Sequence, residues 1–232
     1  MNFQRHPSPN FGERRGGATP DLIVIHYTAM AHAAALERLC DAGCEVSAHY
    51  LIGPDGSVLC LVAEEHRAWH AGAGGWGRVV DINSRSIGIE LSNDGASPFA
   101  AAQMDALEAL LPRIMARWLV PPERVIGHSD MAPLRKQDPG ARFDWRRLAC
   151  AGLSVWPEQG RLINPDAANP DAAAFLRDAK RFGYHVGDAE MALLAFRARF
   201  RPGARGALDG VDMGAMAELA QRFPVDPGPN ST

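Results

Sequence analysis

The sequence contains few cysteines, no long apolar run and no excess of positive charge. Four cysteines in 232 residues are too few and too scattered for a disulfide scaffold, so we expect free thiols. No stretch approaches the ~20 apolar residues of a membrane span. A net charge of -3 provides no basic surface for nucleic acid. With 47% apolar and 22% charged residues, the composition is that of a soluble globular protein.

The amino-terminal segment MNFQRHPSPNFGERRGG lacks the apolar core of a secretory signal peptide, so we expect a cytoplasmic protein. The chain length suits one catalytic domain with a small appendage. Residues 156–170 contain prolines and short polar residues without periodicity, which predicts a linker. The linker divides the chain into a catalytic domain at 1–155 and a helical domain at 171–224. A flexible tail is expected at 225–232.

The apolar patterns predict an α/β fold with a mixed central sheet flanked by helices. Strands are expected at residues 22–25, 50–52, 57–62, 86–92 and 124–126. The first of these is a continuous apolar run, which is typical of a strand buried on both faces and ends at His26. In SIGIELS the apolar residues alternate, which places Glu90 on the face opposite to them.

Helical periodicity appears both between the strands and after them. Helices are expected at residues 33–40, 101–118, 171–182, 188–201 and 211–223. Pro112 should kink or split the second of these helices. The last three helices predict a small three-helix bundle at the carboxyl end.

Two of the eight histidines stand in contexts that favour metal binding. His26 follows a buried strand, where open α/β sheets place their ligands. His128 begins the run HSDMAPLRKQDPG, whose prolines argue for an ordered loop in which Lys136 and Asp138 can point the same way. A histidine taken alone is more often structural. His6, His32, His66 and His185 are therefore interpreted as surface or structural residues.

Five separated motifs between residues 8 and 149 resemble those of the type-2 N-acetylmuramoyl-L-alanine amidases. They are IHYTA, AHYLIGPDG, RAWHAG, SIGIELSN and GHSDMAPLRKQDPGARFDW, in the family's order. The resemblance implies a zinc ion bound by His26, His128 and Asp138. It also implies that Glu90 is the catalytic acid and base, and that Lys136 stabilises the developing oxyanion. More weakly, residues 175–223 resemble a helical peptidoglycan-binding domain.

The implied chemistry is consistent with the residue types. Two neutral imidazoles and one carboxylate leave a tetrahedral zinc ion with one open position, as a catalytic site requires. A compact ammonium suits a point oxyanion, and Lys136 is one of only two lysines in a chain rich in arginine. The family resemblance further suggests substrate-binding side chains in the cleft. These are His49, Trp69, His70 and Asn83.

Each assignment has a structural alternative. Glu90 could be a solvent-facing strand residue, Lys136 a surface cation and Asp138 an Asx-turn residue. Trp69 could belong to the core, and Asn83 could simply form a turn.

Three functions are compatible with the sequence. The favoured one is cytoplasmic cell-wall recycling, in which the amide between the lactyl group of muramic or anhydro-muramic acid and L-alanine is cut in muropeptides or peptidoglycan fragments. The second is an envelope amidase that acts on polymeric peptidoglycan. The third is a recognition module that binds without catalysis.

Overall fold

The computed structural model describes residues 3–158 and 170–226, which form a mixed six-stranded sheet with helices around it. The strand order of this sheet is β1-β5-β4-β7-β3-β8, and within it only β4 and β5 of the described strands pair antiparallel. A separate two-stranded sheet joins β2 and β6. The strands are β1 (Phe3–Arg5), β2 (Phe11–Gly12), β3 (Leu22–Tyr27), β4 (Tyr50–Ile52), β5 (Val58–Cys60), β6 (Arg67–Ala68), β7 (Ser86–Leu91) and β8 (Val125–Gly127).

The central strands β3 and β7 set the positions of two functional side chains. They pair in parallel with His26 opposite Glu90, so both residues lie on the same face of the sheet. Ile23, Ile25 and Ile87 point to the other face, where they are completely buried. The apolar alternation therefore fixes which face carries the polar residues, as the sequence predicts.

Eight α-helices are present in the described part of the chain. They are α1 (His32–Cys40), α2 (Ile82–Arg85), α3 (Ala101–Trp118), α4 (His128–Met131), α5 (Trp145–Cys150), α6 (Ala172–Phe182), α7 (Ala189–Phe200) and α8 (Gly210–Arg222). Helix α3 covers the apolar face of the central sheet, and α1 packs on the opposite face beside β4 and β5. The polar residues of β3 and β7 thus lie on the face that α3 leaves open.

Helix α3 continues through Pro112, so of the kink or split that the sequence predicts there, the split does not occur. Proline removes one backbone hydrogen bond from a helix interior. Leu107, Leu111 and Ile114 on the same helix are fully buried against the sheet. This packing holds the helix together across the missing bond.

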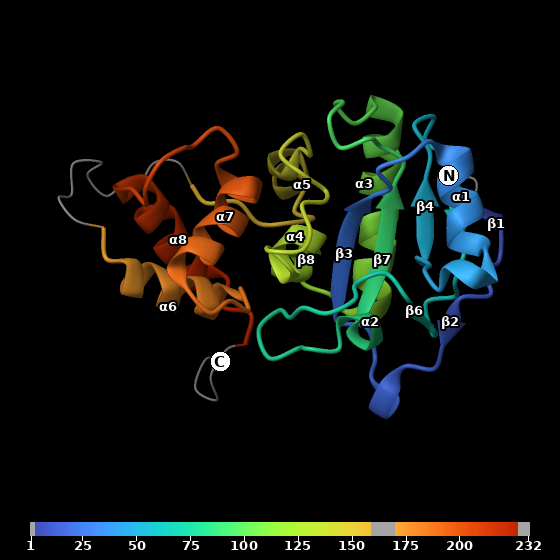
Figure 1. Cartoon of the computed structure of the whole chain (residues 1–232), viewed down its shortest axis with the longest axis horizontal. Helices are drawn as coiled ribbons and strands as arrows, with labels where there is room; N and C mark the ends of the chain where they lie inside the picture. The colour runs from blue at the N-terminus through green and yellow to red at the C-terminus, as the bar shows by residue number, and fades with distance from the viewer. Residues whose placement is uncertain (1–2, 159–169, 227–232) are drawn as a thin grey trace.

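The three carboxyl-terminal helices form a unit beyond the β8 edge of the sheet (Figure 1). An aspartate caps the start of each helix, at Asp171, Asp188 and Asp209. Their core is continuous with that of the sheet, because Phe182 and Tyr184 pack against Trp76. This unit, residues 170–226, is called the helical unit below.

Two sequence predictions need correction. An ordered loop without helix was expected from His128 onward, but α4 begins at His128, because the Asp130 carboxylate accepts a hydrogen bond from Gly127 N and caps the turn. The tail is not frayed at its start. Val225 is buried, and Asp226 accepts a hydrogen bond from Arg78 N.

Most of the predicted linker and the rest of the tail lie outside the described residues, so the proposed domain boundaries stay predictions. Within the residues described, no helix combines the length and the apolar character needed to cross a membrane.

Candidate active site

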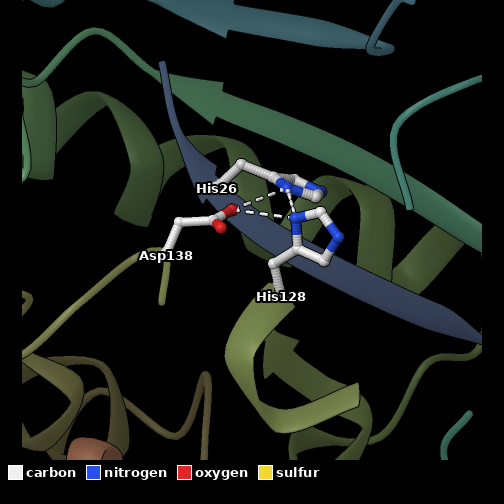
Figure 2. Close-up of side chains that lie close together, drawn as sticks. All are labelled: His26, His128 and Asp138. Atoms are coloured by element: carbon white, nitrogen blue, oxygen red, sulfur yellow. Dashed lines mark hydrogen bonds and ion pairs between the residues drawn. The ribbon is translucent and has the colours of Figure 1, made fainter. Parts of the chain in front are cut away.

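Three side chains from separate elements converge at the carboxyl end of β3 (Figure 2). His26 Nδ1 lies 2.9 Å from His128 Nδ1, and each of these nitrogens lies 3.0 Å from Asp138 Oδ2. His26 comes from β3, His128 is the first residue of α4, and Asp138 follows in the next loop. The structure therefore brings together the three residues that the family resemblance implies as metal ligands.

A chain of hydrogen bonds determines which nitrogen of His26 carries the proton. The Ser86 hydroxyl donates to Ile82 O at 2.6 Å, so its oxygen is left to accept from His70 Nε2 at 3.2 Å. His70 Nδ1 is then an acceptor, and His26 Nε2 donates to it at 3.0 Å. His26 Nδ1 is left with a lone pair that faces His128 and Asp138.

The backbone of another loop orients His128. His128 Nε2 donates to Ala71 O at 2.8 Å, which leaves the Nδ1 of His128 as a second free lone pair. Asn83 Oδ1 accepts from the backbone nitrogens of His70 and Ala71 and so holds this loop in place. Arg135 also donates to Ala71 O, at 2.6 Å. The loop from His70 to Ala71 thus supports both imidazoles.

Three lone pairs within about 3 Å of one another repel unless a cation lies between them. Burial lowers the pKa of His26 to about 4, with a further lowering from His128, so His26 is neutral near pH 7. Two neutral imidazoles and a carboxylate are a donor set that zinc prefers.

The spacing of the three atoms also fits zinc. A tetrahedral zinc ion with bonds of about 2.0–2.1 Å has ligand atoms roughly 3.3 Å apart. The observed separations of 2.9 to 3.0 Å lie slightly below this value. A small outward movement of the side chains would admit the ion. The donor atoms of His26, His128 and Asp138 therefore suit a zinc ion as three protein ligands.

Glu90 lies beside this triangle on the neighbouring strand. Burial raises the pKa of Glu90 to about 8, Asp138 raises it further and Lys136 opposes the shift. Its Oε2 is buried and has no hydrogen-bond partner among residues 3–158 and 170–226. An unpaired buried carboxylate oxygen is costly unless something else uses it. A pKa near the operating pH suits a group that both accepts and releases a proton.

A cleft of about 470 Å³ opens over these residues. Its walls come from β3, from α1 and from the loop between α4 and α5, and His26, His70, Glu90, Lys136 and Asp138 line it. Lys136 lines the cleft and forms no ion pair with the described residues. Arg135 and Arg38 add positive charge to the same walls.

Three of the four predicted substrate-binding residues are not in this cleft. His49 is fully buried, its Nδ1 accepts from Gly88 N and its Nε2 lies 3.1 Å from His66 O. Asn83 is buried and holds the loop described above. Trp69 is half-buried outside the cleft. His49 and Asn83 thus make structural contacts here, whereas His70 lines the cleft, and the substrate-binding roles of all four residues stay predictions.

Sequence reasoning missed Ser86 and Arg135. Ser86 was visible in principle, because it shares a strand face with Gly88 and Glu90. Arg135 adjoins Lys136 in the densest motif, but nothing in the sequence shows that it reaches Ala71.

Comparisons with known proteins identify the family of the chain. Residues 16–141 match the family described as N-acetylmuramoyl-L-alanine amidase, Amidase_2. The N-acetylmuramoyl-L-alanine amidase AmiD of Escherichia coli strain K12 is 35% identical over 233 aligned residues, which cover 88% of this chain and 84% of AmiD.

Two solved structures are similar over nearly the whole chain. E. coli AmiD in complex with the substrate anhydro-N-acetylmuramic acid-L-Ala-D-gamma-Glu-L-Lys superposes with a TM-score of 0.82 at 33% identity, covering 94% of this chain and 99% of AmiD. AmpDh3 from Pseudomonas aeruginosa superposes with a TM-score of 0.80 at 31% identity, covering 93% of this chain and 95% of AmpDh3. Taken with the motifs and the site, these matches show that the chain belongs to the N-acetylmuramoyl-L-alanine amidase family of enzymes.

Proposed function

We propose that this chain is a zinc-dependent amidase that hydrolyses the bond between the lactyl group of muramic or anhydro-muramic acid and L-alanine. The observation that carries the proposal is the convergence of three free lone pairs beside the unpaired Glu90 carboxylate. The solved AmiD structure contains an anhydro-muramyl peptide named as its substrate, which supports the same substrate class here.

His26, His128 and Asp138 would hold the zinc ion. When bound, zinc polarises the scissile carbonyl and makes a nearby water more acidic. Glu90 takes a proton from the attacking water and passes it to the nitrogen of the departing alanine. The Lys136 ammonium stabilises the negative charge that develops on the carbonyl oxygen. His70, supported by Ser86, keeps His26 oriented through these steps.

The cleft is compatible with an anionic peptide substrate. Lys136, Arg135 and Arg38 line its walls, and stem peptides carry carboxylates that such cations attract. A recognition module without catalysis would need neither an unpaired Glu90 nor an open metal position. Enzymatic hydrolysis is therefore favoured over binding alone.

The proposed reaction is tested by product analysis in oxygen-18 water. Purified protein is incubated with anhydro-muramyl and intact muramyl peptides, and the products are identified by mass spectrometry. We expect free peptide beginning with L-alanine and a sugar acid that carries the heavy oxygen in its lactyl carboxylate. Cleavage elsewhere in the peptide, or a label in the released peptide, would contradict this bond assignment. The ratio of the two rates measures the preference for the anhydro sugar.

Cytoplasmic recycling and envelope hydrolysis differ in location rather than in chemistry, so the cytoplasmic location remains a prediction from the sequence. Fractionation of cells that make the native protein tests it. Recovery with spheroplasts supports recycling, whereas recovery in the periplasmic or envelope fraction supports the second function.

A further inference from the structure

An arginine of the helical unit forms a buried ion pair with the part of the chain that contains the sheet, residues 3–158, which is called the amidase half below. Arg199 on α7 and Asp130 on α4 form an ion pair at 2.8 Å, and each side chain is only 1% exposed. Helix α7 lies beside α4 (Figure 1). A buried pair of this kind ties the two elements together, because removing one partner leaves an uncompensated charge in the interior.

Asp130 is also the residue that fixes the start of α4. Its Oδ2 accepts from Gly127 N at 2.8 Å, and its Oδ1 accepts from the hydroxyl of Tyr184, in the helical unit, at 3.2 Å. Helix α4 has only four residues, which is too short to be stable by itself. Its geometry therefore depends on the Asp130 carboxylate and on the two side chains that hold that carboxylate.

Arg199 contacts the chain on both sides of His128. One end of its guanidinium donates to Val125 O on β8 at 3.1 Å and to Ser154 Oγ at 2.9 Å, while the other end binds Asp130. The guanidinium also lies 4.2 Å from the centre of the Trp145 ring. His128 lies between β8 and Asp130, so Arg199 holds the segment that carries this ligand from before and after it.

The neighbouring loop is held by the same unit. Gly75 N donates to Met131 O on α4, and Trp76 packs edge-on against Tyr184 at 5.2 Å between ring centres. The loop that leads to Trp76 carries Ala71, whose carbonyl accepts from His128 Nε2. Two features hold the His128 ring, namely helix α4 and the carbonyl of Ala71. Both are thus connected to the helical unit by these contacts.

We infer that Arg199, assisted by Tyr184, is a positioning residue for the zinc ligand His128, so that the helical unit is a structural part of the metal site. The inference rests on the proposed zinc function. It assigns to this unit a role that is separate from any binding of glycan. Arg199 acts on His128 indirectly, through α4, because it touches none of the three ligands in the contacts described.

The test compares two arginines of α7 in the full-length protein. Arg199→Met removes the pair with Asp130. Arg197→Met is the matched control, because Arg197 is also buried and ion-paired, but its recorded partners lie at residues 206–212 of the helical unit itself. For each variant, circular dichroism checks folding. Competition with a chromophoric chelator then measures the zinc dissociation constant, and the visible spectrum of the cobalt(II) form reports ligand geometry.

We expect Arg199→Met to raise the zinc dissociation constant by about 10-fold or more and to change the cobalt spectrum, as loss of supporting contacts does at metal sites. Arg199→Lys, which keeps a cation beside Asp130, should recover part of the affinity. Arg197→Met should bind zinc like the wild type. Tyr184→Phe removes only the hydroxyl, and we expect a smaller loss of about threefold.

A folded Arg199→Met protein with wild-type zinc affinity and cobalt spectrum would overturn the inference, as would an equal loss in Arg197→Met. If Arg199→Met does not fold, Tyr184→Phe decides, and an unchanged zinc affinity in that variant rejects the coupling. Failure of the wild type to bind zinc would instead refute the proposed function.

Discussion

Glu90 shows at the scale of one residue how burial prepares a carboxyl group for proton transfer. We expect Glu90→Gln to keep its zinc and to lose turnover by about 10²- to 10⁴-fold, because the amide cannot accept the proton of the attacking water. Steady-state kinetics and zinc analysis of the same sample check this. Glu65→Gln, at an exposed glutamate, serves as the control and should behave like the wild type. Turnover that survives in Glu90→Gln would place the base elsewhere.

The same residue should make the stability of the metal-free protein depend on pH. The folded state keeps a proton on Glu90 up to a pKa of about 8, whereas the unfolded chain releases it near 4.5. The folded state therefore binds more protons within this window, and stability falls as the pH rises through it. The other titratable groups are the same in both proteins, so a comparison with Glu90→Gln isolates the Glu90 contribution.

Relative to the wild type, metal-free Glu90→Gln should gain stability from pH 5 to pH 8 by at most about 1.4 kcal/mol per pH unit. Urea unfolding at several pH values measures the difference. A difference that stays constant with pH would show that Glu90 has an ordinary pKa in the folded protein.

At the scale of secondary-structure elements, strand β7 needs a glycine opposite the ring of His70. A Cβ built on Gly88 would lie 2.5 Å from two atoms of that ring, well inside contact distance. We expect Gly88→Ala to displace His70 and to destabilise the protein by about 1–3 kcal/mol through overpacking. The displaced ring would no longer hold His26, so zinc affinity should also fall by about 10-fold.

Gly12→Ala is the control for this substitution. Gly12 also lies in a strand, but an added Cβ meets only Trp69 Nε1 at 4.0 Å. Thermal unfolding and chelator competition on both variants test the prediction. Normal zinc affinity in Gly88→Ala would show that His70 is not needed to orient His26.

The elements that could be predicted are those with a readable period. The buried run at β3 and the alternation in β7 predict both strands, and the alternation places Glu90 on the face opposite the apolar residues of β7. The structure adds that this is the face of His26. Helix α4 could not be predicted in this way, because four residues give no helical period. The carboxylate that caps α4 is fixed by Arg199, which lies 69 residues away in the sequence. Such a contact exists only after the chain has folded.

The candidate site, like the fold, could be predicted from the sequence only in part. The family motifs supplied His26, His128, Asp138 and Glu90, which the structure brings together. Its supporting contacts stayed hidden, because Ser86 and His70 meet only through tertiary packing. The burial of His49 stayed hidden for the same reason. The sequence shows that it follows a loop and precedes a strand, but not that both ring nitrogens face backbone groups.

For the whole molecule, the structure predicts one cooperative unfolding transition. Leu22, Val24 and Ile126 of the sheet belong to the same apolar cluster as Phe175 and Phe196 of the helical unit. Melting of either half would expose the apolar surface of the other. Calorimetry, together with far-ultraviolet circular dichroism and tryptophan fluorescence, should give a single coincident midpoint. Two separated transitions would show that the halves are independent domains.

The zinc requirement is the central claim, and reconstitution tests it most directly. The protein is stripped with a chelator, dialysed and titrated with zinc while release of peptide from an anhydro-muramyl peptide is followed. We predict no turnover without metal and full recovery at one zinc ion per chain, with no recovery in His128→Ala at the same zinc concentration. Undiminished turnover in the metal-free wild type, or recovery in His128→Ala equal to the wild type, would contradict the account.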